Sequence, residues 1–382
     1  MLFKEVIGQE RVKQRLIQTV KDNRVSHAQL FLGPEGSGAL PLAMAYSQYI
    51  VCENKLEKDS CGKCRACIKN QKLVHPDIHF VYPIISSKDI EVSTDLISQW
   101  REAFLENPYI NLFQWYQYLD AENKQGIINA KESAEILRKL SLTTYESEFK
   151  IIIIWMPEKL HITAANKLLK ILEEPFDKTL FILVCENEDQ ILRTILSRTQ
   201  LIKINKIADD DLTKTLREAT NIPAEKTLKI VHMADGNYNT ALQIINESDP
   251  DNEQDSDFNF SGFQKWMRAC FKFEGIKILS WVDEISSQGR EKQKNFLSYT
   301  LQLVRECLIF NYGQEQMVKL EGSELEFIKK FAPFINPGNA ELFSEELSKA
   351  HYHIERNANP KILFFDLSFK INELLNMGTK NS

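Results

Sequence analysis

The chain has 382 residues, of which 43% are hydrophobic and 26% are charged, and its formal net charge is -6. This length predicts two or three domains, and the composition is typical of a globular protein rather than a disordered or fibrous one. No apolar run approaches the roughly 20 residues of a membrane-spanning helix, and the first residues show no signal-peptide pattern, so we expect a cytoplasmic protein without membrane contact. The acidic balance argues against a protein that coats nucleic acid by its own charge, so any DNA contact is expected to be shared with partners.

The first motif along the chain is a glycine-rich loop. Residues 26–32 predict a buried strand, and the loop that follows it has the glycine spacing of a phosphate-binding P-loop. Its glycines are Gly33, Gly36 and Gly38. In an active P-loop the next residues are a lysine, which neutralises the outer phosphates, and a serine or threonine, which ligates Mg²⁺. Ala39 and Leu40 stand there instead, so the sequence predicts a degenerate loop that does not hold ATP. An ordinary glycine turn is the alternative interpretation.

Four of the seven cysteines form a compact C-x8-C-x2-C-x2-C pattern: Cys52, Cys61, Cys64 and Cys67. Without an export signal, cysteines are expected to be reduced thiols unless a metal binds them. Structural Zn²⁺ is held by four thiolates that short turns bring together, and this spacing supplies such turns. The pattern predicts a zinc module at about residues 52–67, with no open catalytic position; an iron–sulfur cluster, which uses similar ligands, is the alternative. The remaining Cys185, Cys270 and Cys307 are expected to pack in the core.

An insertion follows at about residues 77–148, and it is rich in aromatic residues. Its crowded aromatic side chains are Phe104, Tyr109, Phe113, Trp115, Tyr116 and Tyr118. Such residues can stack on single-stranded bases, but few lysines or arginines accompany them to follow the phosphates, which favours packing or a partner surface. Residues 130–140 predict an amphipathic helix that leads into the next strand.

That next strand, at residues 150–154, ends in Trp155, Met156, Pro157 and Glu158. In an active nucleotide hydrolase this strand ends in an aspartate that holds Mg²⁺ and a glutamate that polarises the attacking water. Trp155 and Met156 can perform neither task, and Glu158 comes two or three residues too late without a shift in register. This second departure also predicts that the chain does not hydrolyse ATP.

Three further segments complete a recognisable order: Ala-Ala-Asn-Lys-Leu-Leu-Lys-Ile-Leu-Glu-Glu-Pro at 164–175, an apolar strand at 180–184, and Ser197-Arg198-Thr199. With the glycine loop, they resemble the clamp-loader branch of the AAA+ ATPases, most closely the delta-prime family of bacterial DNA polymerase III. The resemblance covers residues 1 to about 245. The C-terminal third matches only in its helical character and position.

The resemblance implies an α/β fold with a P-loop NTPase-like domain at 1–205, which contains a parallel sheet and the zinc module, and a helical lid at 206–247. From the residues themselves, helices are expected at 209–219, 224–234 and 238–246. Acidic residues without lysine or arginine predict a solvated linker at 248–260. Apolar residues at helical spacing predict an all-α domain at 261–382, which the resemblance identifies with the clamp-loader collar.

The resemblance also implies a role. The chain would be a subunit of the DNA polymerase III holoenzyme without ATPase activity of its own. Its partners would be the gamma/tau and delta subunits, with the sliding clamp and primed DNA reached through the complex. Ser197 and Arg198 match a Ser-Arg-Cys motif whose arginine reaches the gamma-phosphate of a neighbour's ATP, and Thr199 replaces an uncharged cysteine. Asn239 stands where the lid of motor subunits has an arginine. A cysteine zinc module at this place is also a feature of the family.

Two other classes of function compete with this interpretation. An active gamma/tau-like ATPase is disfavoured by Ala39, Leu40, Trp155 and Met156. A stand-alone zinc-containing nucleic-acid-binding protein is disfavoured by the acidic balance and by the resemblance to a AAA+ scaffold, and binding to DNA without partners would revive it.

Overall fold

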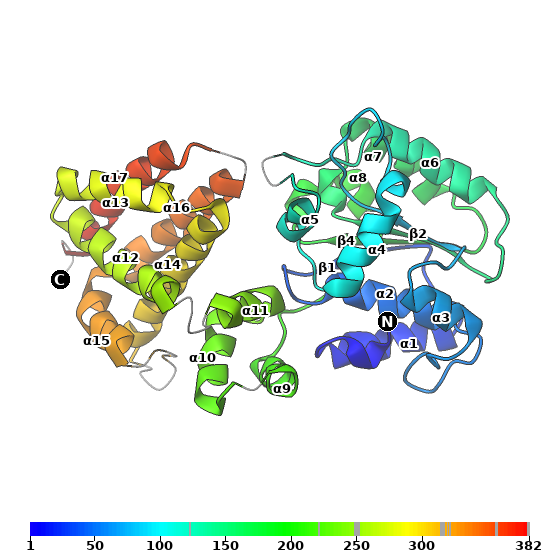
Figure 1. Ribbon diagram of the computed structural model, residues 1–382, viewed down its shortest axis with the longest axis horizontal. Helices are drawn as coiled ribbons and strands as arrows, with labels where there is room; N and C mark the ends of the chain where they lie inside the picture. Colours follow the sequence, from blue (N-terminus) through cyan, green and yellow to red (C-terminus); the bar gives the residue numbers. More distant parts are fainter. Residues whose placement is uncertain are drawn as a thin grey trace. The chain divides into compact units, whose positions relative to one another are not determined.

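The computed structural model describes residues 1–379 apart from 122–123, 221, 248–252, 314–317, 319, 321 and 356–357. The chain forms two compact units, Met1–Ile244 and Ile245–Ser382 (Figure 1). Among the described residues, no helix is both long enough and apolar enough to span a membrane.

The first unit is built on a five-stranded sheet with the order β2-β3-β4-β1-β5. The strands are β1 (Ala28–Leu32), β2 (Ile78–Val81), β3 (Lys150–Trp155), β4 (Thr179–Cys185) and β5 (Gln200–Lys203). Every pairing is parallel, and β1 lies between β4 and β5, with Leu30 opposite both Leu183 and Leu201. Because all strands are parallel, their carboxyl ends meet at one edge, where the loops after β1, β3 and β4 come together.

Both faces of this sheet are buried under helices, as the unbroken apolar strands predict. Ile151 and Ile153 of β3 pack in a core shared with α1 to α5, whereas the alternate residues Ile152 and Ile154 pack in a second core beneath α6 to α8. Figure 1 shows α1 and α2 on the opposite side of the sheet from α6 and α7. The helices are α1 (Glu10–Lys21), α2 (Ala39–Val51), α3 (Arg65–Gln71), α4 (Ile97–Glu106), α5 (Leu112–Tyr118), α6 (Ala130–Ser141), α7 (Ile162–Glu173) and α8 (Arg193–Leu196).

The insertion between β2 and β3 packs its aromatic residues into the core. Trp100 of α4 stacks on Tyr82, with ring centroids 4.3 Å apart, and meets Trp115 of α5 at 5.3 Å. The indole N–H of Trp115 donates to the carbonyl oxygen of Pro83 at 2.9 Å. Phe104, Tyr109, Trp115 and Tyr116 are all buried, and only Tyr118 of the predicted aromatic set is exposed, so the packing interpretation is confirmed.

Three helices complete the first unit after β5. They are α9 (Asp209–Ala219), α10 (Ala224–Ala234) and α11 (Tyr238–Glu247). Their bounds match the three helices that the sequence predicts, to within one residue. Asp235 and Gly236, both with positive φ, end α10 and turn the chain into α11.

The second unit is all-helical, as predicted. It comprises α12 (Glu253–Phe271), α13 (Gly275–Ser286), α14 (Arg290–Asn311), α15 (Gly322–Phe331), α16 (Pro337–Glu355) and α17 (Pro360–Thr379). Its own core includes Trp266 and Trp281, whose rings stack at 4.4 Å, and the indole N–H of Trp266 donates to Ser368. Cys270 and Cys307 are buried here and Cys185 in the first unit, as predicted for core cysteines.

The predicted acidic linker needs a correction. Residues 248–252 lie outside the described residues, but α12 already begins at Glu253, inside the range predicted as linker. The helical part of this range therefore extends the second unit toward its start, and acidic composition alone does not distinguish a linker from a helix.

Candidate functional site

The glycine loop has the strand–loop–helix setting that the sequence predicts. β1 ends at Leu32, and Gly38, with φ of 90°, precedes the first residue of α2. Gly36 also has a positive φ, of 69°. Free backbone N–H groups at such a helix start can bind phosphate, but Pro41, the third residue of α2, has none to offer. The loop therefore lacks a backbone donor as well as the lysine and the hydroxyl.

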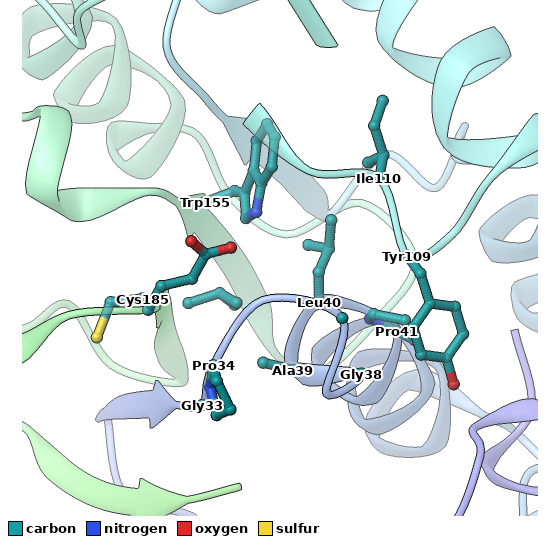
Figure 2. A pocket seen from close by; sticks show the side chains of 13 residues that line it. Gly33, Pro34, Gly38, Ala39, Leu40, Pro41, Tyr109, Ile110, Trp155 and Cys185 are labelled. Carbon is teal, nitrogen blue, oxygen red and sulfur yellow. The ribbon is translucent and has the colours of Figure 1, made fainter. Parts of the chain in front are cut away.

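The hollow beside the loop is small. A hollow of about 30 Å³ lies between the loop and the carboxyl ends of β3 and β4, which is room for about one water molecule, whereas small-molecule sites span roughly 300 to 1,000 Å³. Ala39 and Leu40 are buried. In Figure 2 the side chain of Leu40 points toward the space between Trp155 and Ile110. Ala39 and Leu40 thus offer no polar group where phosphates and Mg²⁺ would need ligands, and the acidic residue that lines the hollow is Glu186.

The end of β3 also differs from that of an active nucleotide hydrolase. Trp155 is buried and contacts the Trp100 ring at 5.1 Å, so it belongs to the aromatic core. Met156 is buried with a positive φ of 57°. Glu158 does not replace the missing carboxylates, because its Oε1 accepts hydrogen bonds from the backbone N–H groups of Glu186, at 2.5 Å, and Asn187, at 3.0 Å. It ties the end of β3 to the end of β4, and burial raises the pKa of its carboxyl.

Asn239 stands at the lid position where motor subunits are expected to have an arginine that contacts phosphate. Its side chain also makes structural contacts. It is 4% exposed. Its side-chain amide donates to the carbonyl oxygen of Tyr109 at 2.5 Å, and its Oδ1 accepts from Asn107 at 3.1 Å. The side chain therefore binds the chain's own insertion.

Arg198 lies between α8 and β5, and its side chain is one-third exposed. Its Nε donates to Glu173 Oε1 at 2.7 Å, and its Nη2 pairs with the same carboxylate. Its Nη1 donates to the carbonyl oxygen of Thr194 at 2.9 Å and to Ser197 Oγ at 3.2 Å. All three nitrogens of the guanidinium thus meet acceptors within the chain, at the surface of the first unit. Ser197 acts as one of those acceptors and itself donates to Thr194.

The four predicted cysteines converge. The sulfurs of Cys52, Cys61, Cys64 and Cys67 lie within 4.8 Å of one another. The Cys52–Cys64 pair is 4.0 Å apart and the Cys61–Cys67 pair 3.9 Å. Tetrahedral Zn–S bonds of about 2.3 Å place sulfurs roughly 3.8 Å apart, so the donor set fits a four-coordinate zinc ion.

Backbone N–H groups surround these sulfurs. Lys63 and Cys64 donate to Cys61 Sγ at 3.4 and 3.3 Å, which is the arrangement that the turn at Gly62, with φ of 69°, makes possible. The hydrogen bond from the Lys63 N–H lowers the pKa of Cys61 to about 6, whereas burial raises the pKa of Cys52 and of Cys67. A thiolate at neutral pH is the form that binds metal. Cys64 also caps the start of α3, so the cluster is held at a helix end.

The structure thus brings the glycine loop and Trp155 together around one hollow, which is lined neither by Met156 and Arg198 nor by the four clustered cysteines. Sequence reasoning missed two features of the loop. Pro41 is visible in the sequence as a residue without an N–H, so this signal was available. Tyr109, which lines the hollow from a segment about 70 residues away in sequence, was noticed only as one of several aromatic residues, because nothing in its neighbourhood signals a long-range contact.

Comparison with known proteins identifies the family of the chain. The family model described as DNA polymerase III, delta subunit, matches residues 8–208. The DNA polymerase III subunit delta' of Bacillus subtilis (strain 168) is 29% identical over 197 residues, which cover 51% of this chain and 46% of that protein. The subunit tau of the same organism is 26% identical over 253 residues, which cover 64% of this chain and 37% of that protein. The chain thus spans less than half of the length of each of these relatives.

Among solved structures, a DNA polymerase III gamma subunit-related protein from Thermotoga maritima aligns with 95% of this chain and 99% of its own, at 12% identity and a TM-score of 0.40. The family assignment rests on the sequence. Because the matching residues 8–208 make up more than half of the chain, this protein belongs to the DNA polymerase III delta-subunit family, in the clamp-loader branch of the AAA+ proteins.

Proposed function

We propose that this chain is a delta-prime-type clamp-loader subunit that does not hydrolyse ATP. It would brace, in the cytoplasm, a complex with gamma/tau and delta subunits that places the sliding clamp on primed DNA. The observation that carries the proposal is the hollow of about 30 Å³ beside a loop with Ala39 and Leu40 at its working positions. Relatives of both the delta-prime and the tau kind are similar to the chain, so the site residues, and not the degree of similarity, favour the non-hydrolysing role.

The proposal includes a contribution to catalysis in a neighbouring subunit. Arg198 lies on the surface of the first unit with its side chain one-third exposed. A guanidinium supplied across a subunit boundary stabilises the charge that develops on a transferred phosphoryl group, an effect of about 10³-fold or more. We propose this role for Arg198, with Ser197 as the residue that helps to hold it. The first unit would act as the AAA+ base and lid, and the helical unit from Glu253 onwards as the collar.

We further propose that the cysteine cluster holds one structural Zn²⁺. The four sulfurs fit tetrahedral coordination, and four protein ligands leave no position for substrate or water. The ion would fix the turn between α2 and α3 and would take no part in phosphoryl transfer.

The test of the proposed function is a reconstituted complex that contains the Arg198→Ala variant. Because the arginine acts only in the transition state, the variant should assemble normally, while hydrolysis at one neighbouring site should fall by about 10³-fold. Total ATP turnover should fall only in part, since the other sites keep their own groups, and clamp loading should fall more clearly. Complex mass, ATP turnover and clamp loading are the measurements.

Arg193→Ala is the matched control, because Arg193 is an exposed arginine five residues earlier, at the first residue of α8. It should leave all three measurements unchanged. Normal clamp loading with Arg198→Ala would exclude the arginine-finger role and leave a purely mechanical brace. Tight binding of primed DNA by the isolated chain would favour the stand-alone nucleic-acid-binding alternative.

A further inference from the structure

The segment at residues 107–111, which joins α4 to α5, reaches from the insertion into the space between the glycine loop and the lid helix α11. Its central residue, Tyr109, is buried. The Tyr109 hydroxyl accepts a hydrogen bond from the backbone N–H of Ile7 at 2.8 Å. The edge of its ring lies 3.1 Å from where a Cβ on Gly38 would stand, and its centroid lies 4.8 Å from the Tyr238 ring. One side chain therefore touches the N-terminal segment, the glycine loop and the lid; Figure 2 shows it beside Gly38 and Pro41.

Polar contacts also tie residues 107–111 to the loop and to the lid. Asn239 of α11 donates to the carbonyl oxygen of Tyr109 and accepts from Asn107. Glu35 of the loop accepts from Asn111 at 2.9 Å and, more weakly, from Asn237 at 3.4 Å. The carboxylate of the loop is thus shared between the insertion and the lid.

The lid also contacts the loop directly. The backbone N–H of Tyr238 donates to the carbonyl oxygen of Gly36 at 3.2 Å. A Cβ on Gly36 would lie only 1.9 Å from Asn237 Oδ1, so this close approach requires glycine. Gly36 of the loop therefore permits the contact with the lid.

These contacts resemble those that a nucleotide would need. A base is held by stacking on an aromatic ring and by hydrogen bonds from protein groups to its polar edge. Tyr109 provides a planar ring packed against Tyr238, with a polar edge that accepts a backbone N–H. We propose that residues 107–111 form a built-in plug, in which Tyr109 occupies the space of a base and the asparagines hold the lid closed without nucleotide.

This inference deepens the proposed function and rests on it in one respect, namely that the loop binds no ATP. It assigns a role to the aromatic insertion, and it makes closure of the lid a property of the folded chain. The consequence is measurable, because backbone amides in a lid that opens exchange their hydrogens faster than those in a lid that is held.

Hydrogen exchange of the full chain, followed by mass spectrometry, tests the plug. Tyr109→Ala removes the ring, and Asn239→Ala removes the tie from the lid. In each variant the amides at 236–242 and 34–40 should exchange about tenfold faster or more, since each lost hydrogen bond weakens closure. The amides of β3 and β4 should stay as protected as in the unaltered chain. Tyr145→Ala, which removes a tyrosine that is 81% exposed, is the control and should change neither segment.

Two further comparisons distinguish a failure of the plug proposal from a failure of the proposed function. Asn239→Ala removes no ring from the core, so it carries the test if Tyr109→Ala does not fold. Unchanged protection at 236–242 in the folded variants would overturn the plug while leaving the proposed function intact. Millimolar ADP should not alter protection in the unaltered chain; a gain in lid protection with ADP would contradict both the plug and the proposed loss of nucleotide binding.

Discussion

At the scale of single residues, Arg198 is held by its own chain before any neighbour is present. Glu173 accepts from two of the guanidinium nitrogens, and Thr194 and Ser197 accept from the third. An arginine binds phosphate best through two parallel N–H groups. To act on a neighbour's ATP, Arg198 must therefore exchange the carboxylate of Glu173 for phosphate oxygens.

This competition predicts the effect of Glu173→Gln in the reconstituted complex. The glutamine keeps the size of the side chain and removes the charge that competes with phosphate, so hydrolysis at the adjacent site should rise. The rise should be about fivefold at most, since exposed ion pairs are worth about 0–1 kcal/mol. Turnover at increasing salt is the measurement, and the difference between the two chains should shrink as salt screens the pair. A loss as large as that of Arg198→Ala would show instead that Glu173 orients the arginine.

At the scale of elements, the turn between α2 and α3 owes its shape to the cysteine cluster. Cys52 lies just after α2, Cys64 caps α3, and Cys67 is buried in its first turn. The cluster therefore joins the end of α2 to the start of α3, outside the strands of the sheet.

Cys64→Ser should lose the metal and loosen this turn without unfolding the sheet. The purified unaltered chain should contain about one zinc per chain, and the variant much less, because three thiolates hold structural zinc poorly. Metal analysis measures the zinc, and hydrogen exchange at residues 52–71 measures the turn. Lys63→Ala, which alters an exposed residue of the same turn, should keep its zinc. Optical absorption of an iron–sulfur cluster in the unaltered chain would contradict the zinc assignment.

β2, at the edge of the sheet, carries a histidine whose titration makes the free energy of unfolding depend on pH. Burial, aided by the charges of Lys139 and Lys150, lowers the pKa of His79 to about 4. In the unfolded chain a histidine has a pKa of about 6.5. The unfolded state therefore binds a proton on this residue at a pH where the folded state does not, and the stability that His79 contributes is present above about pH 6.5 and is lost as the pH falls toward 4.

Between pH 7.5 and pH 5 this single group should lower the free energy of unfolding by about 2 kcal/mol. His79→Gln removes the titration, so its free energy of unfolding should fall less over the same interval. Urea unfolding of both chains at the two pH values gives the comparison. Parallel pH dependence of the two chains would show that His79 is protonated equally well in the folded protein.

At the scale of the whole molecule, the sequence predicts those elements whose signal is local. The strands at β1, β3 and β4 follow from unbroken apolar runs, and the lid helices follow from periodic apolar residues that helix boundaries interrupt. The cysteine cluster follows from spacing alone, because its ligands lie close together in the chain.

Features that depend on distant residues could not be predicted in this way. β5 is short and mostly exposed, so it lacks an apolar run, and it pairs with β1. The helices α4 and α5 lie in the aromatic-rich insertion, and the sequence analysis does not predict them. Tyr109 contacts Ile7 across 102 positions and Asn239 across 130, and no local pattern reports such pairings. The residues on which the proposed loss of nucleotide chemistry rests are visible in the sequence, but the segment that lies beside them is not.

The closed lid has a thermodynamic consequence for assembly. In some subunits a ligand is needed to order the base and the lid. Each cycle of ligand binding and release then includes the entropy cost of that ordering. In this chain Asn239 and Tyr109 already join the two parts, so the cost is met once, during folding. In the proposed complex, the affinity of this chain for a neighbour that binds both base and lid is therefore expected to stay constant through every cycle of ATP binding and release elsewhere in the assembly.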